Sequence, residues 1–158
     1  MTQSASDGGG SQPRVWIVED EPAAASLAAE LCEGCGAVVS VFEGPLPYLD
    51  ALRTDVAPVA VVLDWRLERQ LSAAVYMTTR HHYPSLPVVY WTGSPASSLP
   101  AMIRDDARTT VVDKAGGTAS FERALAWALA GSTDDATAEP MAEPSLAPMP
   151  EPTAEQPA

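Results

Sequence analysis

The sequence predicts an α/β fold: a doubly wound, five-stranded parallel sheet in a three-layer αβα arrangement. Short apolar runs rich in Val alternate with segments whose apolar residues recur at helical spacing, which is typical of a parallel sheet covered by helices. In the stretch from Pro58 to Leu67, residues 59–63 are apolar throughout, as in a central strand buried on both faces. Asp64 follows directly and would lie at the carboxyl end of that strand, where ligands bind in open α/β sheets.

The first part of the chain contains two strand–helix units. The first strand leads through a cluster of acids to Pro22, which suits the first turn of a helix because its missing N–H would be unpaired there anyway. The apolar residues of this helix follow the spacing i, i+3, i+4, i+7, and Gly34 or Gly36 ends it. We predict strands over residues 14–18 and 37–42 and a short second helix over residues 46–56.

The second part repeats the strand–helix order three times. The segment that follows Thr92 has poor helix propensity and contains Pro100, so a short or irregular element is expected there. The last helix begins after Gly116-Gly117, and its inward face consists of Phe121, Leu125, Ala128 and Leu129. We predict a helix over residues 71–81 and strands over residues 86–91 and 110–113.

The predicted strand order is 2-1-3-4-5, the flavodoxin-like order, with right-handed crossovers and helices on both faces. Strands one and three are then neighbours, and Glu19 and Asp20 at the end of strand one lie beside Asp64. Three carboxylates so close to one another repel each other unless a cation binds between them or one of them is protonated. Ligands that are all oxygen favour Mg²⁺, so Glu19, Asp20 and Asp64 form the predicted metal site.

Two further polar residues follow the strands on the other side of Asp64. Thr92 follows strand four, and Lys114, the only lysine of the chain, follows strand five. A metal site, a carboxylate nucleophile and two donors for phosphoryl oxygens resemble a phosphoryl-transfer site, with Asp64 positioned to be phosphorylated. Taken singly, Thr92 could equally satisfy a turn at the strand end and Lys114 could be a surface charge.

Composition sets limits on the class of protein. A chain of 158 residues can bury one core, and we expect a folded body over residues 14–131 between a disordered arm, residues 1–13, and a disordered acidic, Pro/Ala-rich tail, residues 132–158. The net charge of −12 argues against nucleic-acid binding, which needs a basic surface. The sequence contains neither a membrane span nor a signal peptide, so a cytoplasmic protein is expected. The lone Cys32 and Cys35 do not complete a zinc site.

The motifs VEDE, VVLDW, YWTG and VVDK, in this order from Val15 to Leu129, resemble those of response-regulator receiver domains of two-component signalling. The resemblance implies that Asp64 accepts a phosphoryl group from a histidine kinase or a histidine phosphotransfer protein. It also implies that the backbone carbonyl of Arg66 joins the Mg²⁺ ligands, and that Thr92 and Lys114 bind the phosphoryl group. The chain would then be a stand-alone receiver, either a phosphorylation-controlled binding module or a phosphate sink, with no enzymatic activity beyond self-phosphorylation and autodephosphorylation.

The sequence departs from the family pattern at three places. The switch position that works with Thr92 is usually aromatic, and here it is Val111. Ala115 stands where the family usually has a cis-proline, so a trans bond after Lys114 is expected. Glu68-Arg69 replaces the usual Pro-Gly in the loop after Asp64. These departures leave open a pseudo-receiver that binds its partner without phosphorylation. A Mg²⁺-dependent aspartyl-phosphate phosphatase is the other alternative, although Arg66 stands where that enzyme class has a second Asp.

Overall fold

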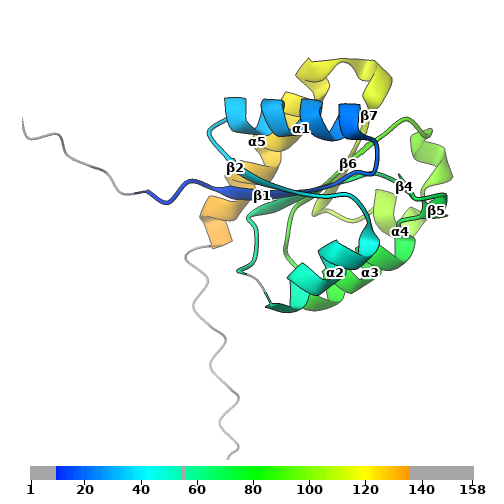
Figure 1. Ribbon diagram of the computed structural model, residues 1–158, viewed down its shortest axis with the longest axis horizontal. Coiled ribbons are helices and arrows are strands. Elements are labelled where there is room, and N and C mark those ends of the chain that lie inside the picture. The colour runs from blue at the N-terminus through cyan, green and yellow to red at the C-terminus, as the bar shows by residue number, and fades with distance from the viewer. Residues whose placement is uncertain (1–9, 55, 136–158) are drawn as a thin grey trace, which may run out of the picture.

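A computed structural model describes residues 10–54 and 56–135 (Figure 1). Strands and helices alternate along the chain and form three layers, with the sheet in the middle and helices on either side. The elements are β1 (Arg14–Val18), α1 (Pro22–Gly34), β2 (Val38–Phe42), α2 (Pro45–Thr54), β3 (Ala60–Leu63), β4 (Arg66–Leu67), β5 (Gln70–Leu71), α3 (Ala73–His82), β6 (Val88–Thr92), η1 (Ala96–Ser98), α4 (Ala101–Arg104), β7 (Thr109–Asp113), η2 (Lys114–Gly116) and α5 (Thr118–Asp135).

The main sheet has the order β2-β1-β3-β6-β7, and all its strand pairs are parallel. Counted along the chain, this is the predicted order 2-1-3-4-5, and the predicted fold class is confirmed. Helices α1 and α5 cover one face and α2, α3 and α4 the other (Figure 1). Because the strands of the main sheet are all parallel, they present their carboxyl ends at the same edge, on the right in Figure 1.

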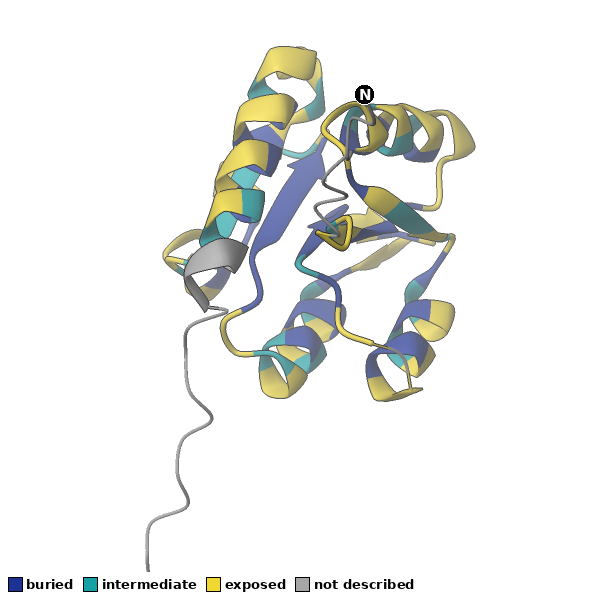
Figure 2. Cartoon of the chain, turned by 90° about the vertical axis from the view of Figure 1, so that its left-hand side faces the viewer, coloured by how far each residue is buried: buried dark blue, intermediate teal, exposed yellow. Residues whose placement is uncertain are grey.

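The alternation of side chains along each strand divides the core into two clusters. In β1, Trp16 and Val18 pack with Tyr48 and other residues on the α2–α3 face, whereas Val15 and Ile17 pack on the α1–α5 face. All four residues of β3 are buried, as expected for a central strand. Buried strands flanked by helices with exposed outer faces are seen in Figure 2. The inward face predicted for the last helix is also found, because Phe121, Leu125 and Ala128 are fully buried.

A small antiparallel hairpin, β4–β5, lies in the loop after Asp64 and was not predicted from the sequence. Arg66 pairs with Leu71 and Leu67 with Gln70. The turn residues Glu68 and Arg69 have φ of 48° and 68°, values that two-residue hairpin turns require and that Asn or Gly usually supplies. Two-residue strands are too short to show an alternating pattern, and the turn lacks the usual residues. The helix predicted from residue 71 consequently begins at Ala73.

The remaining differences concern the ends of elements, as in β6, which runs from Val88 to Thr92 and not over the predicted residues 86–91. After Pro95 the chain forms only η1 and the four-residue α4, as the weak propensity predicted. Helix α5 continues past Gly131 to Asp135, so the folded body extends beyond the predicted boundary. Residues 1–9 of the predicted arm and residues 136–158 of the predicted tail lie outside the described residues.

Within the described part of the chain, no helix is long and apolar enough to span a membrane.

Candidate functional site at the carboxyl edge of the sheet

The parallel register brings the ends of β1 and β3 together. Val18 pairs with Leu63, so the next residues, Glu19 and Asp64, lie side by side. The Asp64 N–H donates to the Val18 carbonyl at 3.2 Å, and the Glu19 N–H donates to the Phe42 carbonyl at 3.1 Å. Backbone pairing thus continues one residue past each strand and fixes the position of both carboxylates.

Glu19, Asp20 and Asp64 form the predicted acidic cluster. One carboxylate oxygen from each lies within 4.8 Å of the others, close enough to share one cation. Glu19 and Asp64 are only 3% and 8% exposed, whereas Asp20 is open to solvent. Burial raises the pKa of Glu19, and the hydrogen bond from Lys114 offsets part of this effect. A set of hard oxygen ligands with one exposed member fits Mg²⁺, which usually keeps several waters.

Lys114 contacts two of the three carboxylates. Its Nζ lies 2.6 Å from Glu19 Oε2 and 2.9 Å from Asp64 Oδ2. Burial disfavours the ammonium, but the two hydrogen bonds outweigh it, so the pKa of Lys114 is raised and the side chain stays charged. One ammonium against three carboxylates leaves the cluster negative. This imbalance favours the binding of a divalent cation.

The other ligand and donor residues are close to this cluster. Arg66, whose carbonyl is the further predicted Mg²⁺ ligand, donates its N–H to Asp64 Oδ1 at 3.3 Å. Thr92 is buried at the end of β6, and its hydroxyl accepts the Ser94 N–H at 3.1 Å. The hydroxyl oxygen of Thr92 thus satisfies the turn after β6, and its O–H can donate to another acceptor while the oxygen accepts from Ser94.

The predicted switch position, Val111, lies in β7, which β6 separates from the strand that precedes Asp64. Val111 pairs with Tyr90 across β6 and β7, is half-buried and packs against the core cluster of the α2–α3 face. After β7 the chain turns into η2, where Asp113 accepts the Ala115 N–H at 2.8 Å. No described peptide bond is cis, and the Lys114–Ala115 bond is trans as expected.

Several residues contribute to the site without having been predicted. The hairpin places the Glu68 N–H on Asp20 Oδ2 at 2.9 Å, and the Arg66 guanidinium Nε donates to Ser94 Oγ at 3.3 Å. The indole of Trp91 lies beneath the Lys114 ammonium, 5.4 Å from ring centre to Nζ. Trp91 belongs to the YWTG motif, but an aromatic residue in a strand is ordinarily expected to be part of the core. Only the structure shows that it also contacts Lys114.

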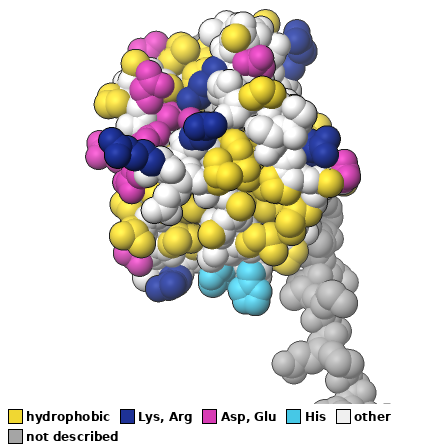
Figure 3. All heavy atoms as spheres, turned by 90° about the vertical axis from the view of Figure 1, so that its right-hand side faces the viewer, with side chains coloured by type: hydrophobic (Ala, Val, Ile, Leu, Met, Phe, Trp, Pro, Cys, Tyr) yellow, Lys and Arg dark blue, Asp and Glu magenta, His cyan; other side chains and the backbone are white. Residues whose placement is uncertain are grey.

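Figure 3 shows this edge of the molecule. Acidic and basic side chains gather together on one part of it, and apolar side chains cover much of the remaining surface. Among the described residues, exposed apolar side chains near these elements include Leu71 of β5, Met77 of α3 and Met102 of α4. The edge therefore combines a charged site with apolar surface beside it.

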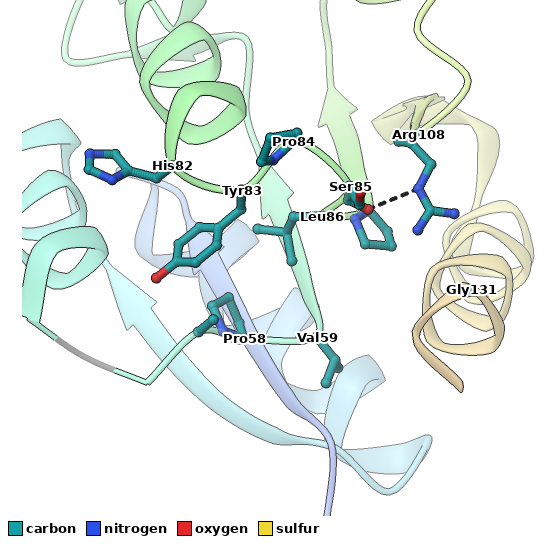
Figure 4. Close-up of a pocket in the computed structure, with 11 residues that line it drawn as sticks. Pro58, Val59, His82, Tyr83, Pro84, Ser85, Leu86, Arg108 and Gly131 are labelled. Atoms are coloured by element: carbon teal, nitrogen blue, oxygen red, sulfur yellow. Dashed lines mark hydrogen bonds between the residues drawn. The ribbon is translucent and has the colours of Figure 1, made fainter. Parts of the chain in front are cut away.

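A cavity of about 380 Å³ lies at the opposite end of the sheet. Pro58 and Val59 lie before β3, and Tyr83, Pro84 and Leu86 lie before β6; all five line this cavity (Figure 4). Arg108 and Gly131 close its other side, and Arg108 donates to the Ser85 carbonyl at 2.9 Å. The acids and donors predicted from the sequence do not line this cavity. We therefore assign the chemistry to the carboxyl edge and not to this cavity.

No protein-family model matches this chain, and no curated protein sequence does either. Solved structures do share its fold. A response regulator receiver protein from Sinorhizobium medicae WSM419 is 18% identical, with a TM-score of 0.65 over 77% of this chain and 97% of that one. The signal receiver domain of an HD domain-containing protein from Pseudomonas fluorescens Pf-5 is 16% identical, with a TM-score of 0.69 over 78% of this chain and 99% of that one.

A third similar structure is the signal receiver domain of a putative LuxO repressor protein from Vibrio parahaemolyticus, which is 16% identical. Its TM-score is 0.69 over 80% of this chain and 96% of that one. The chain thus has the fold of response-regulator receiver domains, as the motifs indicated. Each of these relatives is spanned almost completely by this chain.

Proposed function

We propose that this protein is a single-domain response regulator that accepts a phosphoryl group on Asp64. The observation that carries the proposal is the Lys114 ammonium held between Asp64 and Glu19 at the carboxyl edge of a receiver-type sheet. Asp64 already has the ammonium of Lys114 in direct contact. This arrangement is preorganised to stabilise the negative charge that a phosphoryl group brings to the site.

The chemistry assigned to the residues is a simple displacement. An Asp64 carboxylate oxygen attacks the phosphorus of a phosphohistidine, the new P–O bond forms as the P–N bond breaks, and the imidazole leaves. Lys114, already at 2.9 Å from Asp64 Oδ2, donates to a phosphoryl oxygen. The Thr92 O–H supplies a second donation, which does not compete with the Ser94 N–H that the same oxygen accepts. Glu19, Asp20, Asp64 and the Arg66 carbonyl would hold Mg²⁺, which when bound neutralises charge on the phosphoryl oxygens.

The proposal includes the partners and the location. A sensor histidine kinase or a histidine phosphotransfer protein donates the phosphoryl group, and a downstream protein reads the phosphorylated state, in the cytoplasm. Because Val111 offers no ring to fill the space that Thr92 leaves, the coupling to other surfaces is weak. A phosphate sink or a low-gain adaptor fits this better than a strict on/off switch.

The test is intact-mass spectrometry after incubation with a small phosphodonor and Mg²⁺. We expect one phosphoryl adduct that is absent in Asp64→Asn and with EDTA present. Glu43→Gln is the matched control, because Glu43 is an exposed acid that follows the neighbouring β2 and should leave the adduct intact. An adduct that persists in Asp64→Asn would refute the assignment.

Adduct formation, partner binding and phosphate release together distinguish this proposal from a pseudo-receiver and from a phosphatase. A pseudo-receiver would form no adduct with any donor and would bind its partner equally well as Asp64→Asn. A phosphatase would release phosphate over many turnovers from small organic phosphates. We expect neither, and autodephosphorylation of Asp64 should be the only hydrolysis.

A further inference from the structure

Lys114 has a third neighbour in addition to its two carboxylate partners. Its Nζ lies over the indole ring of Trp91, 5.4 Å from the ring centre. A cation within about 6 Å of the face of a Trp ring is attracted by the ring quadrupole, and Trp is the strongest of the aromatic residues in this respect. The ammonium therefore rests on an aromatic face while it donates to Glu19 and Asp64.

The ring of Trp91 is held firmly in place. Trp91 is only 5% exposed and packs with the cluster of the α1–α5 face, where the ring centre of Phe121 lies 5.0 Å from its own. Tyr90, its neighbour in β6, packs into the cluster of the opposite face. Trp91 thus forms a rigid floor between helix α5 and the charged site.

Hydrogen bonding does not explain the placement of this ring. The indole Nε1–H is buried and has no hydrogen-bond partner among the described residues. Buried Trp N–H groups usually find a partner, and leaving one without is unfavourable. Packing against Phe121 and the attraction to the Lys114 ammonium are the interactions that favour this orientation.

We propose that Trp91 is a positioning residue for Lys114. The lysine stem is flexible, and its ammonium must stay close to the cluster while it exchanges carboxylate oxygens for phosphoryl oxygens. The indole face keeps the ammonium at the site during this exchange, because attraction to a ring does not compete with hydrogen bonding to oxygens. The part that concerns phosphorylation rests on the proposed function; the contact itself does not.

The first test detects the contact directly by NMR. Lys114 is the only lysine, so protein grown with ¹³C-lysine gives one ε-methylene signal that needs no assignment. We expect an upfield ring-current shift that disappears in Trp91→Leu and remains in part in Trp91→Phe. Trp16→Leu is the matched control, since Trp16 is equally buried but packs on the other face of the sheet. An unshifted signal in the wild type would overturn the proposal, even if Trp91→Leu fails to fold.

The second test is a double-mutant cycle on the single-turnover rate of phosphorylation by a small phosphodonor. Trp91→Leu should slow the reaction about threefold to tenfold, within the range expected for a partly desolvated cation–π contact, and Trp91→Phe should recover part of the rate. In a Lys114→Met background Trp91→Leu should have no further effect, because Trp91 acts through Lys114. Equal slowing in both backgrounds would indicate a merely structural role. Failure of the wild type to take up phosphoryl would instead contradict the proposed function and leave the NMR result standing.

Discussion

Replacing Lys114 with Met removes the ammonium that contacts both Glu19 and Asp64. The wild-type ammonium makes hydrogen bonds of 2.6 Å and 2.9 Å to these carboxylates. Removing one partner of a buried ion pair costs about 3 to 5 kcal/mol, and because Lys114 is 20% exposed we expect the low end, about 3 kcal/mol. The measurement is urea unfolding at neutral pH in EDTA.

Divalent metal should reverse part of this loss. The ammonium and Mg²⁺ compete for the same carboxylates, so Lys114→Met should bind Mg²⁺ more tightly than the wild type while it is phosphorylated more slowly. Binding to the folded state at a hundredfold excess over Kd adds about 2.7 kcal/mol to the free energy of unfolding. The difference between Lys114→Met and wild type should therefore be smaller in Mg²⁺ than in EDTA.

The control is Arg123→Met, which removes an exposed cation on α5 whose guanidinium donates to Ser120 Oγ at 3.2 Å. We expect a change within about 0.5 kcal/mol and no dependence on Mg²⁺. If Lys114→Met costs no more than this control in EDTA, or the same in Mg²⁺ as in EDTA, then Lys114 does not balance the charge of the cluster.

Four further predictions follow from the same structure. Asp20→Asn should weaken the Mg²⁺-dependent change in tryptophan fluorescence and Glu21→Gln should not, because Glu21 is exposed and outside the cluster. Burial opposes ionisation of Asp106, but hydrogen bonds from Tyr76, the Arg108 N–H and Arg80 lower its pKa to about 2. The stabilisation by this carboxylate is present above pH about 4 and is lost as the pH falls through 2, so Asp106→Asn should reduce the free energy of unfolding by up to about 2 kcal/mol at pH 7 and by much less at pH 2. Truncation after Asp135 should leave the Tm within a few degrees and the phosphorylation rate unchanged, since the removed acidic, Pro-rich sequence offers little apolar surface to bury. With Val111 at the switch position, a beryllofluoride phosphoryl mimic should cause only small changes in amide exchange over residues 95–131; complete conversion to a dimer would contradict this.

The sheet could be predicted because each of its strands contains consecutive apolar residues and because β1 and β3 are each followed directly by an acid. Ala60–Leu63 illustrates this: burial of all its side chains requires a central position, and that position puts Asp64 at the edge. The parallel order then brings Glu19 beside it without any long-range signal in the sequence. Local pattern and topology together account for the acidic cluster.

The parts that sequence could not predict depend on single tertiary contacts. The left-handed conformations of Glu68 and Arg69 go against the preferences of both residues, and the bond from the Glu68 N–H to Asp20 is one interaction that stabilises the turn. The extension of α5 to Asp135 follows no apolar repeat beyond Leu129. The contact of Trp91 with Lys114 joins two strands whose side-chain directions are fixed only in the folded sheet.

The choice of lysine at position 114 is itself informative, because all eight other basic residues of the chain are arginines. A guanidinium is planar and binds one carboxylate through two parallel bonds, which would fix it on a single acid. The compact ammonium instead divides its donors between Glu19 and Asp64 and still rests on the Trp91 ring. Each contact can then be exchanged separately, so a phosphoryl oxygen can replace a carboxylate oxygen without loss of the others. The geometry around Lys114 thus suits the proposed exchange of partners better than an arginine at this position would.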